Sequence, residues 1–182
     1  IFSKTFLDTF VFIGGCGTAL SFVLALYIAS KQSHNRKMSF VALPSALFNI
    51  SEIAVFGFPI IFNLTMLIPF ILTPVILTLI SASAIKTGLV PAVTQSVEWT
   101  IPVLLSGYQA TGSVSGSLLQ LSNLLVGVFI YMPFVRRSEK QETGKFKQAV
   151  RQMEQDMAAG ERDGVIPAYL SHKYPYYYYA KT

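Results

Sequence analysis

Charged residues are scarce over the first three quarters of this sequence and concentrated in its last quarter. Only 8 of the 23 Asp, Glu, Lys and Arg residues lie at positions 1–135, and the other 15 lie at 136–182. Three uncharged runs, 9–30, 53–85 and 99–135, exceed the roughly 20 apolar residues that a helix needs to cross a bilayer. We therefore expect a membrane domain at 1–135 and a charged tail or linker at 136–182.

The overall composition agrees with this division. The mean hydropathy is +0.51, and charged residues make up 13% of the chain, about half of their share in an ordinary soluble domain. This composition disfavours a soluble enzyme and a disordered linker. The net charge of +5 is divided between the two regions, and neither is basic enough to indicate a nucleic-acid partner.

Residue types that perform catalysis or hold metals are few. The two histidines, His34 and His172, have no His, Cys or carboxylate neighbours at metal-ligand spacing, and the single cysteine, Cys16, has no partner for an internal disulfide. We expect no metal, no cofactor and no self-contained active site. Because the chain begins with Ile and has no signal-peptide pattern, we expect it to be the middle or the end of a longer protein.

Positive charges determine the expected orientation in the membrane. The loop at 31–37 and the pair at 136–137 are basic, and the positive-inside rule places both on the cytoplasmic side. The number of full crossings between them must then be even. The apolar runs at 64–85 and 115–135 supply two crossings, and the run at 8–30 supplies a third helix before the basic loop.

Two apolar segments, 38–63 and 87–114, must then enter and leave the membrane on the same side. Polar residues interrupt each segment near its middle, at 49–52 and at 98–100. A carboxylate at mid-membrane costs roughly 2.5–3.5 kcal/mol, so we expect these interruptions to be the tips of re-entrant hairpins that meet near the midplane, as in transporters with broken helices. The predicted fold is an all-α integral membrane protein with three transmembrane helices and two re-entrant hairpins.

An amphipathic cytoplasmic helix is predicted to follow, over 139–157. Its apolar stripe has helical spacing and consists of Phe146, Val150, Met153 and Met157. Gly160 is expected to end this helix. Such a helix would lie on the cytoplasmic face of the membrane or lead to another domain.

The first predicted span contains a glycine-rich patch, Gly14-Gly15-Cys16-Gly17. A phosphate-binding loop is one interpretation, but no strand precedes the patch and no Lys-Ser or Lys-Thr follows it. Small residues that let helices approach closely are the favoured interpretation.

Glu52 is the strongest single candidate for function because it is the only charge in the stretch 38–84. An ionisable group inside a membrane indicates function by default, and a carboxylate accepts two charge-assisted hydrogen bonds from sugar hydroxyls. A structural carboxylate bonded to backbone N–H groups is the alternative. The amides of Asn49 and Asn63 also suit hydroxyl pairs. Trp99 is suited either to stacking on a sugar ring or to anchoring at the membrane interface.

Seven short motifs and Asn63 occur in a fixed order within about residues 8–136. The motifs are Phe12–Leu20, Leu43–Glu52, Phe56–Pro59, Ile68–Phe70, Trp99–Pro102, Leu105–Gly107 and Ala110–Gly112. In this order they resemble the membrane component IIC of bacterial phosphoenolpyruvate-dependent sugar phosphotransferase systems, in the lactose, cellobiose and diacetylchitobiose branch. Several ordered motifs together are far more specific than any one of them alone.

This resemblance implies a homodimeric permease in the bacterial cytoplasmic membrane, with its tail in the cytoplasm. The substrate would be a β-linked disaccharide such as cellobiose, chitobiose or lactose, which a cytoplasmic IIB partner phosphorylates. The family's sugar-contacting glutamate, implicated in phosphorylation, corresponds to Glu52. Sugar-binding residues are expected at Asn49, Ser51, Glu52, Asn63, Trp99 and Thr100. The dimer interface of the family lies in its N-terminal half, so this chain is expected to be the C-terminal part of the transport unit.

A sensor without transport activity is the alternative interpretation. The family's Asn-Glu-Pro motif is replaced here by Ser51-Glu52-Ile53. A degenerate IIC-like module could instead pass ligand occupancy through the helix at 139–157 to a cytoplasmic signalling domain, such as a cyclic-dinucleotide enzyme. A third interpretation, a purely structural membrane anchor, leaves Glu52 unexplained.

Overall fold

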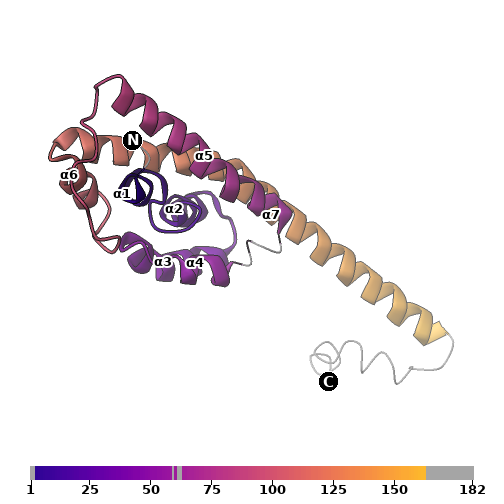
Figure 1. Ribbon diagram of the computed structural model, residues 1–182. Helices are drawn as coiled ribbons and strands as arrows, with labels where there is room; N and C mark the ends of the chain where they lie inside the picture. The colour runs from indigo at the N-terminus through magenta and orange to yellow at the C-terminus, as the bar shows by residue number, and fades with distance from the viewer. Residues whose placement is uncertain (1–2, 59, 61–62, 163–182) are drawn as a thin grey trace. The chain divides into compact units, whose positions relative to one another are not determined.

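Helices form all of the regular secondary structure in the part of the chain that the structure describes. The computed structural model describes residues 3–58, 60 and 63–162 (Figure 1). Its elements are α1 (Lys4–Phe6), the π-helix η1 (Leu7–Val11), α2 (Ala19–Ala29), α3 (Ser33–Leu47), α4 (Glu52–Gly57), α5 (Leu64–Lys86), α6 (Leu105–Thr111) and α7 (Val114–Arg162). The predicted all-α class is confirmed for these ranges.

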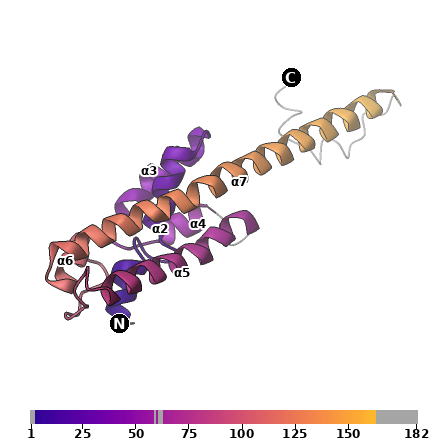
Figure 2. The ribbon, with the colours of Figure 1, turned by 90° about the horizontal axis from the view of Figure 1, so that it is seen from above.

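Two described helices, α5 and α7, are long and apolar enough to cross a membrane. They lie side by side in both views (Figures 1 and 2) and contain the runs predicted at 64–85 and 115–135. The chain divides into two compact units, Ile1–Glu139 and Lys140–Thr182. The apolar part of α7 belongs to the first unit, which also contains all of the other helices.

The single continuous helix expected over 8–30 is wrong, because residues 12–18 form a turn between η1 and α2. Glycines cause the break: Gly15 has φ +96° and Gly17 has φ +65°, conformations that glycine adopts without the steric cost of a side chain. A Cβ at Gly17 would lie 2.2 Å from the Phe70 ring. The remaining α2 has 11 residues and is about 16 Å long.

The segments predicted as hairpins differ from each other. Helices α3 and α4 are joined by a short turn at 48–51, which is the helix–turn–helix shape expected for 38–63, although residues 59 and 61–62 lie outside the described ranges. The second segment has a helical arm only at α6, and 88–104 has no regular helix. Gly88, Pro91 and Pro102 interrupt this stretch, and proline cannot donate the backbone hydrogen bond that a helix interior needs.

Helix α7 continues without a break through the basic pair at 136–137 to Arg162. The amphipathic helix predicted over 139–157 is therefore the later part of α7 and not a separate element. The predicted end at Gly160 is wrong, because the helix continues past it. Good helix formers such as Gln, Met, Ala, Glu and Arg surround this glycine in the sequence and offset its cost of about 1 kcal/mol.

The core of the first unit surrounds α2. Its apolar side chains are almost completely buried, with exposures of 4% or less for Leu20, Phe22, Val23, Ala25 and Leu26. Helix α3 packs against α2, and Tyr131 of α7 lies in the same cluster. At 25 cal/mol per Å² of apolar surface, burial of one such large side chain stabilises the fold by about 1.5–3 kcal/mol. Helix α2 is therefore the centre of the hydrophobic core of this unit.

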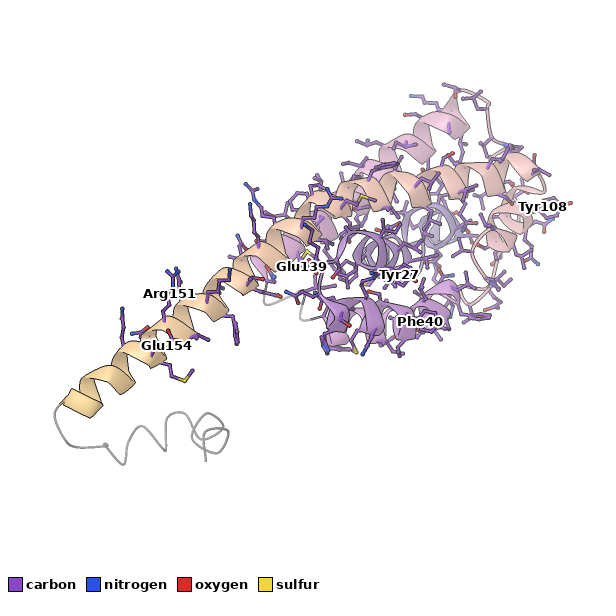
Figure 3. All side chains as sticks on the ribbon, turned by 180° about the vertical axis from the view of Figure 1, so that it is seen from behind. Tyr27, Phe40, Tyr108, Glu139, Arg151 and Glu154 are labelled. Carbon is purple, nitrogen blue, oxygen red and sulfur yellow. The ribbon has the colours of Figure 1, made fainter. Side chains whose placement is uncertain are left out.

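The buried carboxylate of Glu139 ties α7 to the connection between α2 and α3. It accepts hydrogen bonds from the Ser30 hydroxyl, from the Lys31 backbone N–H at 3.1 Å and from the Asn35 amide at 3.0 Å. Figure 3 labels Glu139 on α7 near this end of the first unit. Burial raises the pKa of Glu139, but the donors from Ser30, Lys31 and Asn35 outweigh it, so the pKa lies below the ordinary value for Glu.

We predict that Glu139→Gln destabilises the protein by about 1–3 kcal/mol, because its amide group would present N–H donors to Ser30 and Lys31, which are themselves donors. Thermal unfolding in mild detergent measures this effect. The exposed Glu142 gives a matched control, Glu142→Gln, with little expected change.

The lowered pKa of Glu139 stabilises the fold above the unfolded pKa of about 4.3, and this stabilisation disappears as pH falls through the lower folded pKa. Equal acid sensitivity in wild type and Glu139→Gln would contradict the assignment.

Candidate functional site

The side chain of Asn49 joins three separate parts of the chain. Its Oδ1 accepts the backbone N–H of Gly14 at 2.7 Å, and its Nδ2 donates to the carbonyl oxygens of Trp99 at 2.6 Å and Ile101 at 3.3 Å. Asn49 has φ +61°, a left-handed conformation in which Asn is enriched. The glycine turn, the tip between α3 and α4 and the Trp99 segment therefore meet at one amide.

The glycine turn also approaches this tip closely at Gly15. A Cβ there would lie 2.8 Å from the Asn49 backbone oxygen and from the Ser51 Cβ. Next to it, the Ser51 hydroxyl oxygen accepts the backbone N–H of Cys16 at 3.3 Å. The small residues of this patch thus permit close approach, as the sequence predicts, but they do so within a turn and not along a helix.

A cavity of about 360 Å³ lies beside these contacts. It is lined by Lys4, Asp8, Phe12, Gly15, Cys16, Asn49 and Trp99. The Trp99 side chain is 50% exposed, and the Lys4 ammonium lies 3.9 Å from the Asp8 carboxylate. The lining thus combines two aromatic rings with a carboxylate, an ammonium and an amide. Such a set can stack on an apolar ring face and exchange hydrogen bonds with hydroxyl groups.

The site lies beside the apolar part of α7. Ile13, Ala46 and Val103 are buried in one cluster, and Leu124 packs against that cluster. Residue 124 is at the centre of the apolar run at 115–135. The three connections that form the site therefore lie beside the apolar part of α7.

The structure brings Asn49, Ser51 and Trp99 together, but it places the other predicted residues differently. Glu52 is exposed at the first position of α4, next to Ser51, and Thr100 is exposed beside Trp99. Neither Glu52 nor Thr100 lines the cavity.

Asn63 lies at the start of α5 and has a different set of partners. Its Oδ1 accepts the N–H of Thr65 at 3.1 Å, and its Nδ2 donates to the Ser138 hydroxyl at 2.6 Å. Ser117, by contrast, donates to the Leu104 carbonyl near the Trp99 segment. Residues 117 and 138 are separated by about 30 Å along an α-helix, so Asn63 is not part of the cavity.

The sequence alone did not identify Lys4, Asp8, Phe12 and Cys16 as residues that line the cavity. Lys4 and Asp8 precede the first uncharged run at a spacing of four residues, which brings two side chains to one helix face. That spacing is the signal that could have identified them. Asp8 lies on the π-helix η1, a helix type that often occurs at functional sites. In the described ranges, no three His, Cys, Asp or Glu side chains form a potential metal site.

We predict that Asn49→Asp disrupts this site. The new carboxylate would keep the size of the side chain but place acceptors against the carbonyl oxygens of Trp99 and Ile101. The expected loss of stability is about 1–3 kcal/mol, measured by thermal unfolding. Gln148→Glu makes the same chemical change at an exposed position in the later part of α7 and should have little effect. If both variants unfold like the wild type, the Asn49 amide does not hold the three segments together.

Comparisons with known proteins identify related sequences and one related structure. The family model described as "Phosphotransferase system, EIIC" matches residues 1–74. The oligo-beta-mannoside-specific EIIC component of the PTS of Bacillus subtilis (strain 168) is 35% identical over 168 residues, which are 91% of this chain and 37% of that protein. The lichenan permease IIC component of the same organism is 39% identical over 145 residues, which are 78% of this chain and 32% of that protein.

A solved structure supports the same relationship. The crystal structure of the transporter ChbC, the IIC component from the N,N'-diacetylchitobiose-specific phosphotransferase system, matches with a TM-score of 0.75 and 35% sequence identity. The match covers 80% of this chain and 34% of that chain. The chain thus spans about a third of the length of these relatives.

Proposed function

The chain belongs to the phosphotransferase system EIIC family, and we propose that it forms part of the sugar-binding and sugar-translocating unit of a membrane permease. The proposed substrate is a β-linked disaccharide or short oligosaccharide. The names of the relatives refer to oligo-β-mannosides, lichenan and diacetylchitobiose, which supports this substrate class. Which of these sugars is preferred depends on contacts in the site.

The convergence of three chain segments on Asn49 is the observation that carries the proposal. Its bonds to Gly14, Trp99 and Ile101 bring the glycine turn and the Trp99 segment together beside a cavity of about 360 Å³, which Asp8 also lines. Small-molecule sites usually have volumes of roughly 300–1,000 Å³ and combine apolar walls with a few polar groups. In our proposal the Trp99 ring covers the C–H face of a sugar, and Asp8 accepts hydrogen bonds from its hydroxyls.

The proposed membrane arrangement is supported by the position of this site beside the apolar part of α7. We propose that α5 and α7 cross the bilayer, that the segment from α1 to α2 forms an interrupted third crossing, and that 38–63 and 87–114 enter as re-entrant hairpins. Non-helical backbone at that depth requires surrounding protein or a water-filled cavity, and the Asn49 contacts supply the former. In this arrangement 1–135 is the membrane domain, and 136–182 is a cytoplasmic tail.

Glu52 and the phosphorylation step belong to the same proposal. Glu52 is exposed and follows Ser51 at the tip between α3 and α4, so its carboxylate is available to a sugar that extends beyond the cavity. We propose that Glu52 binds a sugar hydroxyl and positions it for phosphoryl transfer from a IIB partner in the cytoplasm. In the same proposal Ser51 and Thr100 also bind the sugar, and the permease is a homodimer. The hydrogen bonds of Asn63 favour a structural role for that residue.

The sensor alternative receives no support from the relatives named above, which are permease or transport components. The replacement of the residues around Glu52 therefore bears on substrate preference within a transport family.

Cys16 offers a direct test of the proposed sugar site, because it is exposed and lines the cavity with Trp99. In membranes that contain the full gene product, we predict that cellobiose or diacetylchitobiose slows modification of Cys16 by N-ethylmaleimide several-fold. Mass spectrometry of the peptide that contains Cys16 measures the modification. Maltose, an α-linked disaccharide, is the control and should give no protection. Equal rates with and without every β-linked sugar tested would exclude this cavity as the site.

Glu52→Gln tests the role of the carboxylate. The variant retains the size of the side chain but loses the charge that strengthens hydrogen bonds to hydroxyls, so sugar binding should weaken by at least about tenfold, equivalent to roughly 1.4 kcal/mol. Equilibrium binding of radiolabelled sugar to the purified full gene product measures this change, and Glu142→Gln is the control. Unchanged binding and uptake by Glu52→Gln would contradict the assignment.

A further inference from the structure

Helix α3 has an outer face whose character changes sharply along its length. The face repeats every three to four residues and consists of Arg36, Lys37, Phe40, Val41, Pro44 and Leu47, all of them exposed. The opposite face contains Ser39, Ala42 and Ala46, which are fully buried. The outer face is therefore cationic over its first part and apolar over the rest, and the change occurs within about one helical turn, or 5.4 Å.

A concave region of about 550 Å³ lies at the cationic end of this face. It is lined by Tyr27, Lys31, Ser33, Arg36, Lys37, Phe40 and Val41. Figure 3 labels Tyr27 and Phe40 on two different helices at this part of the first unit. The lining contains three cationic side chains and no carboxylate, so this region would attract an anion.

The three cations of this region have no ion pair within the part of the chain that the structure describes. The Arg36 guanidinium lies 5.4 Å from the centre of the Tyr27 ring, a cation–π contact that leaves its N–H donors available. The Glu139 carboxylate, which accepts the backbone N–H of Lys31, also accepts bonds from Ser30 and Asn35. Its hydrogen-bonding capacity is therefore directed at those donors and not at the three cationic side chains.

The apolar part of the outer face distinguishes a lipid from a soluble anion. Phe40 is 67% exposed and Val41 is 59% exposed, directly after the cations. A phospholipid has the same sequence of chemistry, with a phosphate next to acyl chains. Basic side chains beside membrane helices attract anionic head groups, and aromatic and basic residues gather at the membrane interface. A soluble phosphate would use the cations but make no contact with Phe40 and Val41.

From these contacts we propose that the outer face of α3 binds an anionic phospholipid. Its phosphate lies among Lys31, Arg36 and Lys37, with the Ser33 hydroxyl as a further donor, and one acyl chain follows Phe40 and Val41 toward Leu47. The site is separate from the cavity at Asn49 and does not depend on which sugar binds there.

The experiment uses the full gene product in neutral detergent, titrated with dioleoylphosphatidylglycerol and, in parallel, with dioleoylphosphatidylcholine. Native mass spectrometry measures the bound fraction of each lipid. We expect tighter binding of phosphatidylglycerol, and we expect Lys31→Gln, Arg36→Gln and Lys37→Gln combined to weaken it at least about tenfold. Lys140→Gln, Lys145→Gln and Lys147→Gln combined remove the same charge on the later part of α7 and should leave the affinity close to that of the wild type.

Two further arms distinguish the lipid from other ligands. Phe40→Gln leaves the charge unchanged and should weaken phosphatidylglycerol several-fold, because acyl contacts are lost. Inorganic phosphate at the same concentration should not displace the lipid. The proposal is overturned if both triple variants bind alike, if Phe40→Gln has no effect, or if phosphate alone competes as well as the lipid. Each variant is first compared with the wild type by thermal unfolding, and single replacements of the same cations, which should each give a smaller loss, are used if a triple variant unfolds early.

Discussion

The breaks in the helices require polar partners, and a few amide side chains provide them. A buried backbone group without a hydrogen bond costs about 1–3 kcal/mol, and an apolar surrounding offers no water as a substitute. Asn49 satisfies groups in the glycine turn and in the Trp99 segment. Gln120 and Asn123 of α7 donate to the carbonyl oxygens of Thr9 and Phe10 at 2.8 and 2.9 Å, at the π-helix. The interrupted architecture depends on these amides.

The same contacts connect the fold to the site. Because Asn49 holds the turn at Gly14 and Gly15 against the Trp99 segment, the cavity walls are fixed by hydrogen bonds and not only by apolar packing. Gly15 is required for this geometry, since any Cβ there would collide with the tip between α3 and α4. A polar ligand can then replace water beside preorganised donors and acceptors. This saves part of the cost of ordering the site on binding.

Hydropathy and charge placement predicted the two long apolar helices and the turn between α3 and α4, because long uncharged runs have few alternatives to burial or a membrane. They failed where local backbone conformation decides. The break at 12–18 depends on positive φ angles at glycines that also suit close helix packing, and the irregular stretch 88–104 has no periodic signal. Asp8 was missed since its position in the cavity wall depends on which segments meet at Asn49, a long-range contact that no local pattern encodes. The bonds of Asn63 to Thr65 and Ser138 were not indicated by the sequence for the same reason.

Helix α3 links the two ends of the first unit. Near its start, Asn35 donates to Glu139 of α7, and just after its end Asn49 holds the glycine turn. Its inner face is buried through small residues, Ala42 and Ala46, which allow close contact with α2 and leave little room for sliding without loss of packing. A displacement of α3 would therefore have to break hydrogen bonds at both of its ends or carry α2 with it. The contacts on the outer face of α3 and the geometry of the cavity are therefore coupled through this helix.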